Sequence, residues 1–188
     1  MRADVQLDTN VLRAATRAVF AESSVDAPLE KIAERSGIDV HTIQSHFINR
    51  AALIAFALEE ELDSYESAIA QLRGEHKAGV ALTLWTQRYV EFLLATRGLA
   101  ACLSASTADD DGLAFYFEER LGTALQALLD EAFEAGEMQA TQAPHLLLAV
   151  AGLCRLASEA SPKEAGRLAS LLTDGLRYGA TAGARSLH

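Results

Sequence analysis

Residues 28–47 read PLEKIAERSGIDVHTIQSHF, and this stretch predicts two short helices that meet at a glycine. The first would cover 28–36, because proline is tolerated in a first helical turn, and Gly37 would end it with a positive φ. Asp39 would then cap a second helix over 39–47. Two short helices joined in this way form a helix-turn-helix, whose second helix enters the major groove of DNA.

The second of these helices would bury Ile43 and present short or amide-bearing side chains outward. Gln44 suits bidentate bonding to adenine, while Thr42 and Ser45 suit phosphate or base edges. The candidate DNA contacts on this face are Val40, His41, Thr42, Gln44, Ser45 and His46. The two histidines are five residues apart, which is not the i, i+4 spacing of metal ligands, so no metal site is expected.

Helical spacing of apolar residues extends through almost the whole chain. A first helix is expected to begin after a cap at Asp8 or Thr9, and Asn49 should cap a long helix over 50–72. Further helices are expected over 77–96, 98–106, 113–135, 144–160 and 162–182. No run alternates β-branched residues, so we predict an all-α fold of about nine helices.

Composition limits the class of protein before any motif is considered. The 188 residues are 50% hydrophobic and carry a net charge of −10, which excludes disorder. Residues 1–50 are nearly neutral, so the acidity belongs to the remainder of the chain. Cys102 and Cys154 lie in apolar runs and are expected to be buried and reduced. Neither a signal peptide nor a membrane span is apparent, and a cytoplasmic protein is expected.

Several segments together resemble a known family. They are VLRAA at 11–15, VFAE at 19–22, IAERSGI at 32–38, Thr42-Ile43 and His46-Phe47. This combination, within residues 9–55, resembles the DNA-binding domain of the TetR/AcrR family of transcriptional regulators. Residues 84–102, with Arg97-Gly98-Leu99-Ala100, look like the C-terminal domain of the SbtR-like subgroup. The resemblance implies a three-helix helix-turn-helix domain over 1–52 and a helical ligand-binding and dimerisation domain over 53–188.

The resemblance also implies roles for individual residues. Arg50, at the start of the fourth helix, and His46 match family positions that contact phosphate. Val40, His41, Thr42 and Gln44 would face the bases. The chain departs from the family pattern where Val40 replaces a lysine, Gln44 a tyrosine and His41 a small residue, which removes expected phosphate donors.

Aromatic residues gather in the segment 80–135, where they form either a packed core or an apolar ligand pocket. The candidate ligand contacts are Trp85, Tyr89, Phe92, Arg97, Cys102 and Tyr116. The acidic composition favours a cationic or neutral hydrophobic effector. The last two helices combine leucine with small residues, which favours a homodimer formed through them and hence a palindromic operator.

The predicted function is a ligand-responsive dimeric DNA-binding regulator, a repressor that a small hydrophobic effector releases. The alternative is a helical dimer that binds a small molecule or a partner and whose DNA-binding head has lapsed. No enzyme is expected and no cofactor, because no zinc-protease motif, phosphate loop or nucleophile elbow occurs. Glu59-Glu60-Glu61 is expected to be a solvated helical face, and 109–111 an exposed loop or a lid over a pocket.

Overall fold

The computed structural model describes residues 8–105, 112–158 and 162–185, and within these ranges all regular structure is helical. The described helices are α1 (Thr9–Glu22), α2 (Leu29–Ser36), α3 (Val40–His46), α4 (Arg50–Glu75), α5 (Ala78–Ala95), α6 (Leu99–Ser104), α7 (Leu113–Glu134), α8 (Ala143–Ser158) and α9 (Pro162–Arg185). The predicted all-α fold is therefore confirmed. The acidic segment 109–111 lies outside the described residues.

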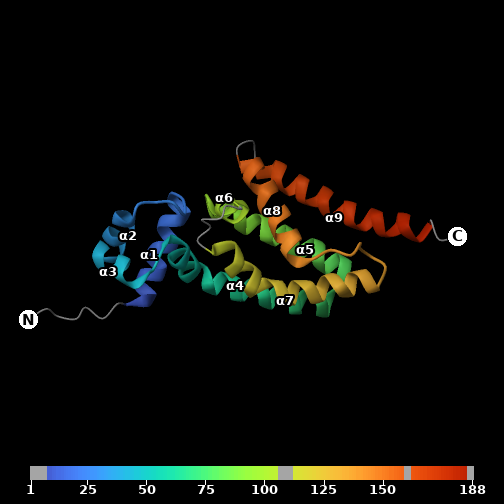
Figure 1. Ribbon diagram of the computed structural model, residues 1–188, viewed down its shortest axis with the longest axis horizontal. Helices are drawn as coiled ribbons and strands as arrows, with labels where there is room; N and C mark the ends of the chain where they lie inside the picture. The colour runs from blue at the N-terminus through green and yellow to red at the C-terminus, as the bar shows by residue number, and fades with distance from the viewer. Residues whose placement is uncertain (1–7, 106–111, 159–161, 186–188) are drawn as a thin grey trace, which may run out of the picture.

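Helices α1 to α3 form a small head at one end of an elongated molecule (Figure 1). Asp8 caps α1 by accepting bonds from two backbone amides, and Gly37 ends α2 at a φ of +70°. Asp39 caps α3 in the same way as Asp8 caps α1. The buried side chains of Ile32 and Ile43 hold α2 and α3 together. The predicted helix-turn-helix is thus present at the expected residues.

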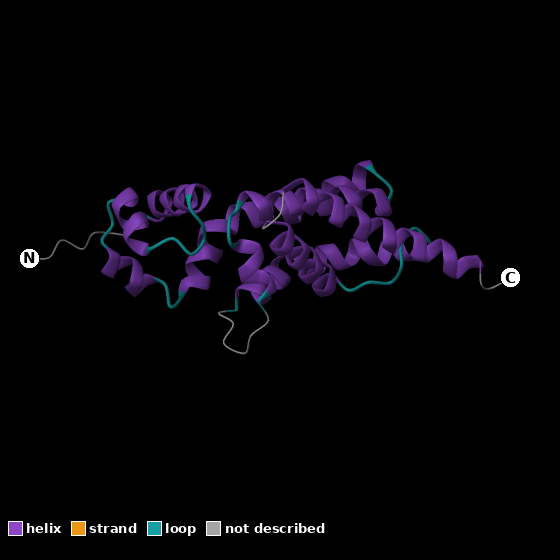
Figure 2. Ribbon diagram, turned by 90° about the horizontal axis from the view of Figure 1, so that it is seen from above, coloured by secondary structure: helices purple, strands orange, loops and turns teal. Residues whose placement is uncertain are grey.

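Helix α4 begins in the head and continues without interruption into the larger body formed by α5 to α9 (Figures 1 and 2). Asn49 caps it, as predicted, by accepting a 2.9 Å bond from the amide of Ala52. The predicted domain boundary after residue 52 falls inside this helix. The head and body are consequently joined by a rigid element rather than by a flexible linker.

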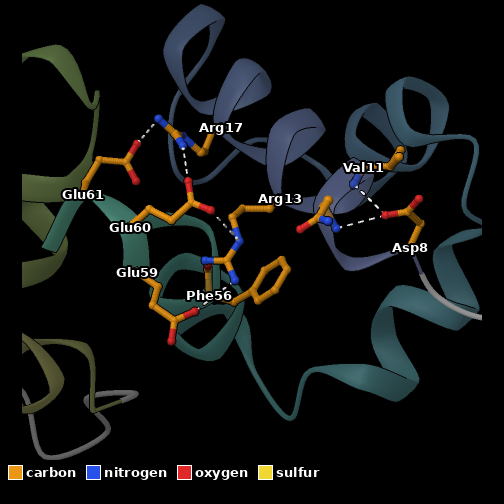
Figure 3. A network of polar contacts seen from close by, with 9 residues as sticks. Asp8, Val11, Arg13, Arg17, Phe56, Glu59, Glu60 and Glu61 are labelled. Carbon is orange, nitrogen blue, oxygen red and sulfur yellow. Dashed lines mark hydrogen bonds and ion pairs between the residues drawn. The ribbon is translucent and has the colours of Figure 1, made fainter. Parts of the chain in front are cut away.

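The run Glu59-Glu60-Glu61 on α4 faces solvent at Glu59 and Glu60, as expected from the sequence, whereas Glu61 is half-buried, and all three carboxylates pair with arginines of α1. Arg13 of α1 pairs with Glu59 at 2.9 Å and donates a 2.6 Å bond to the carbonyl of Phe56 (Figure 3). Arg17, one turn further along α1, pairs with both Glu60 and Glu61 (Figure 3). The three glutamates therefore connect α4 to α1, and we call this set of ion pairs the arginine–glutamate clamp.

A second contact joins the turn between α1 and α2 to the turn between α5 and α6. The amide of Val25 donates a 2.9 Å bond to the carbonyl of Arg97. Gly98, at a φ of +85°, lies so close that a Cβ atom there would stand 2.9 Å from Ser24 Oγ. On the other side, the guanidinium of Arg50 donates to the carbonyls of Val25 and Ala27. We call these contacts the head–body joint.

The body encloses an aromatic core. The rings of Trp85 and Tyr89 stack at 5.2 Å, and those of Phe92 and Phe117 stack at 6.3 Å. Trp85 is fully buried, and its indole donates a 3.0 Å bond to the carbonyl of Tyr65 on α4. This packing fixes α5 against α4 and α7. No described helix is long and apolar enough to cross a membrane.

Candidate nucleic-acid interface and ligand cavity

Helix α3 presents most of its side chains to solvent. Ile43 is its one fully buried residue, whereas His41, Gln44, Ser45 and His46 are exposed, and Val40 and Thr42 are half-buried. The Asp39 carboxylate accepts from the amides of His41 and Thr42, which holds the first turn of the helix. The bond from the Thr42 hydroxyl and the bond from the His41 amide keep the pKa of Asp39 below its usual range.

Two of the predicted DNA contacts already have partners within the helix. The Thr42 hydroxyl donates to Asp39, and the Ser45 hydroxyl donates a 2.9 Å bond to the carbonyl of Thr42. Within the described chain, the side chains of His41, Gln44 and His46 make no hydrogen bond. These three side chains therefore keep their full capacity for contacts outside the protein.

Sequence reasoning missed one residue at this surface. Ile48 is 94% exposed and lies in the turn between α3 and α4, beside the face that carries Gln44. An isoleucine so fully exposed next to a helix-turn-helix suits apolar contact with thymine methyl groups or sugars. The signal was present in the sequence as an apolar residue directly before the Asn49 cap.

The described cations of the head are largely engaged inside the protein. Arg13 and Arg17 belong to the arginine–glutamate clamp, and Arg35 pairs with Glu22 at 2.6 Å. Arg50 lies in the head–body joint, where burial lowers the pKa of its half-buried guanidinium. The predicted phosphate contact of Arg50 stays a prediction, and the structure gives this side chain a structural role as well.

A cavity of about 190 Å³ lies in the body among α5, α6, α7 and α8. It is lined by Tyr89, Leu103, Ala105, Ala114, Phe117, Glu118, Pro144, His145, Leu147 and Leu148. The hydroxyl of Tyr89 makes no hydrogen bond among the described residues, and burial raises the pKa of this tyrosine far above its usual value. Glu118 and His145 add polar groups that sequence reasoning did not select. We call this space the effector cavity.

Of the six predicted ligand contacts, Tyr89 lines the effector cavity, and the structure places the other five elsewhere. Trp85 is enclosed in the aromatic core, and the backbone of Arg97 belongs to the head–body joint. Phe92 lines a separate groove between α1, α4 and α5. Helical spacing placed Trp85, Tyr89 and Phe92 correctly on one helix, α5, but it did not separate the side that faces the cavity from the sides that pack.

Cys102 and Tyr116 are both half-buried. Cys102 lies on α6, near enough to Arg50 to oppose slightly the lowering of the Arg50 pKa by burial. Tyr116 lies beside the ring of Phe117, and burial raises the pKa of its hydroxyl. Burial also raises the pKa of the Cys154 thiol to about 11, so this thiol stays protonated at neutral pH. The described side chains include no group of three histidines, cysteines or carboxylates that could hold a metal ion.

An outward helix on a helix-turn-helix head, joined to a helical body that holds a cavity, is the arrangement expected of a transcriptional regulator. The family of SbtR-like transcriptional regulator C-terminal domains matches residues 77–178. A TetR transcriptional regulator of Streptomyces coelicolor, SCO0520, is 31% identical, with 90% of this chain and 98% of that chain covered and a TM-score of 0.59. The chain therefore belongs to the TetR family of transcriptional regulators, with an SbtR-like C-terminal domain.

Two further solved structures share the fold at low identity. RolR, solved with resorcinol, is 16% identical over 89% of this chain and 86% of its own, with a TM-score of 0.64. FadR of Bacillus subtilis, solved with stearoyl-CoA, is also 16% identical, over 90% of this chain and 98% of its own, with a TM-score of 0.64. No curated protein matches the sequence. Regulators of this family bind DNA and small effectors, and the chain is a transcription factor rather than an enzyme.

Proposed function

We propose that the protein is a dimeric repressor that reads a palindromic operator with α3 and leaves it when a small effector enters the effector cavity. The observation that carries the proposal is that α3 is held firmly on its inner side and exposed on its outer side. Its cap is satisfied by Asp39 and its inner side is fixed by Ile43, while His41, Gln44 and His46 remain exposed and unbonded among the described residues. Such a rigid, outward helix is what base reading in the major groove requires.

The size of the effector cavity supports a small effector. A volume of about 190 Å³ lies below the roughly 300–1,000 Å³ of sites for drug-sized ligands, so a single ring with short substituents suits it. The rings of Tyr89 and Phe117 suit an aromatic compound, and the Tyr89 hydroxyl would supply a directed hydrogen bond. RolR, one of the structural neighbours, was solved with resorcinol, which is a single-ring compound.

Exposed leucines on the last two helices support the dimer. Leu148 and Leu156 on α8 and Leu171 on α9 are 49%, 59% and 67% exposed in the single chain. A two-fold partner that packs α8 and α9 against their copies would cover these side chains. Replacing Leu156 and Leu171 together with glutamate should yield a folded monomer in light scattering. Phe133→Glu, which changes an exposed side chain on α7, is the matched control and should remain dimeric.

The route from the cavity to the head runs through α6. Leu103 on α6 and Ala105, the residue that ends α6, line the effector cavity, and the N-cap of α6 is Gly98, which lies in the head–body joint. An effector that displaces α6 would therefore act on the turn that supports α2 and α3. A ligand releases DNA only through its different affinity for the two arrangements, and a 100-fold release needs about 2.7 kcal/mol.

The proposal is tested by titrating fluorescent DNA from the promoter of the protein's own gene, with a shuffled duplex as competitor. Gln44→Ala should weaken promoter binding by about 1–3 kcal/mol and leave binding to shuffled DNA unchanged. Gln71→Ala, which truncates an exposed amide on α4 far from α3, is the matched control and should have no effect. Equal affinity of the unaltered protein for both duplexes would contradict the proposal.

One observation favours the alternative, in which the helix-turn-helix head has lost its ability to bind DNA. Arg13, Arg17, Arg35 and Arg50 all have partners inside the protein, which leaves few cations for phosphate. If the head has lapsed, promoter affinity should be weak at low salt and should not differ between the two duplexes. The same titration therefore separates the two functions.

A further inference from the structure

A groove separate from the effector cavity lies where the head meets the body. It is bounded by α1, α4 and α5 and has a volume of about 580 Å³. Its residues are Arg17, Ala18, Phe20, Ala21, Leu58, Glu61, Tyr65, Glu91, Phe92, Ala95 and Thr96. None of them lines the effector cavity. We call it the head–body groove.

The polar side chains of the head–body groove carry an excess of negative charge. Arg17 is the one cation among the described residues that line it, and this guanidinium is shared between Glu60 and Glu61. Glu61 uses one carboxylate oxygen for Arg17, while its Oε2 atom is buried and accepts no hydrogen bond (Figure 3). Glu91 is exposed, and no described cation lies within ion-pair distance of it.

A buried carboxylate oxygen without a donor is costly, and the cost is relieved by a cation or an N–H group. The other lining groups suit an apolar body attached to that cation. The rings of Tyr65 and Phe92 lie 5.0 Å apart in the groove, and Phe20 and Leu58 add apolar surface. Aromatic faces attract an organic cation, and the attraction strengthens where water is excluded.

We propose that the head–body groove is a ligand site for an amphipathic organic cation, a compound with one ammonium group on an aromatic or alkyl body. The ammonium would lie between Glu61 and Glu91, and the apolar body would contact Tyr65 and Phe92. An anion is disfavoured because the carboxylates outnumber the one guanidinium. A neutral compound would bring no positive charge to Glu91 or to the Glu61 oxygen that Arg17 does not pair with.

A compound bound there would touch the head and the body at once. Arg17 and Ala18 belong to α1 of the head, whereas Glu91 and Ala95 belong to α5 of the body. Both helices lie beside α4, so the ligand would bridge them and hold the head in its present orientation. The site is independent of the proposed repressor function, since it requires neither the effector cavity nor DNA.

The test is a calorimetric titration of the full chain without DNA, using 4-phenylbutylammonium as the probe and 4-phenylbutan-1-ol as its neutral isostere. The ammonium should bind at least about tenfold more tightly than the alcohol. Glu91→Gln should weaken ammonium binding about three- to fivefold, the range expected for one partly exposed ion pair. Glu134→Gln, an exposed acid near the end of α7, is the charge-matched control and should leave the affinity unchanged.

The location is tested by filling the groove. Ala95 is exposed, so Ala95→Trp should preserve the fold, which an unfolding curve verifies, and should abolish ammonium binding. Leu148→Trp, in the effector cavity, should not change ammonium binding. The proposal would be overturned if the alcohol bound as tightly as the ammonium, or if the Ala95→Trp variant bound the ammonium as tightly as the unaltered protein does. Neither outcome bears on the repressor proposal, because DNA is absent.

Discussion

Gly98→Ala is the substitution that most directly tests the head–body joint. Gly98 has a φ of +85°, which an alanine adopts only with strain. The new Cβ would also stand 2.9 Å from Ser24 Oγ and 3.1 Å from Val25 Cγ2. Ser24 Oγ cannot easily give way, because it accepts a 3.0 Å bond from the amide of Asp26. The two turns must therefore separate by a few tenths of an ångström.

The expected loss of stability has two parts. The left-handed backbone costs an alanine about 1–2 kcal/mol. Separating the turns also weakens the 2.9 Å bond from the Val25 amide to the Arg97 carbonyl, a further loss of about 1 kcal/mol. Together these predict that Gly98→Ala lowers the free energy of unfolding by about 2–3 kcal/mol.

Gly136→Ala is the matched control. Gly136 also has a positive φ, +68°, but an added Cβ would meet nothing within 4 Å. It should therefore show only the backbone cost of about 1–2 kcal/mol in urea denaturation. Amide hydrogen exchange gives the second measurement, since Val25 should lose protection in Gly98→Ala and keep it in Gly136→Ala. Equal losses of stability together with an unchanged Val25 exchange rate would refute the idea that Gly98 holds the two turns together.

Three further predictions concern single side chains. In urea denaturation, Tyr65→Phe should cost about 1 kcal/mol, because it loses a 3.1 Å bond to a backbone carbonyl. Tyr89→Phe should change the free energy of unfolding by less than about 0.5 kcal/mol, because its hydroxyl makes no hydrogen bond among the described residues. Arg13→Leu should cost about 1–2 kcal/mol, but Arg35→Leu, which breaks an exposed pair, at most about 0.5 kcal/mol. Asp39→Ala should lower the thermal unfolding midpoint at pH 7. The difference in midpoint between the variant and the unaltered chain should shrink as the pH falls below about 4, because a carboxylate with a lowered pKa stabilises the fold only while it is ionised.

The helices were predictable because their ends carry local signals. Asp8, Asp39 and Asn49 cap α1, α3 and α4 through their own side chains, and Gly37 ends α2, so a few neighbouring residues decide each boundary. The outward row of α3 was predictable for the same reason. On a short helix whose one buried side chain is Ile43, the positions on the opposite side, His41, Gln44 and Ser45, face solvent by geometry alone.

The lining of the effector cavity was not predictable in this way. Trp85, Tyr89 and Phe92 all lie on α5, yet they pack into the core, the effector cavity and the head–body groove respectively. The spacing of apolar residues along a helix indicates which of its sides are buried, but it does not indicate which other helix packs against each side. Glu118 and His145 reach the cavity from α7 and α8, which the sequence could not place beside α5.

The arginine–glutamate clamp escaped prediction because its partners are more than forty residues apart in the sequence. Arg13 and Arg17 supply two of the few positive charges of the head, and both are committed to α4. A phosphate that recruited either side chain would have to break its pairs with Glu59 or Glu60. Reorientation of α1 against α4 would break the same pairs and free the same cations. The affinity of the head for phosphate and its orientation on the body are therefore linked, because both depend on one set of ion pairs.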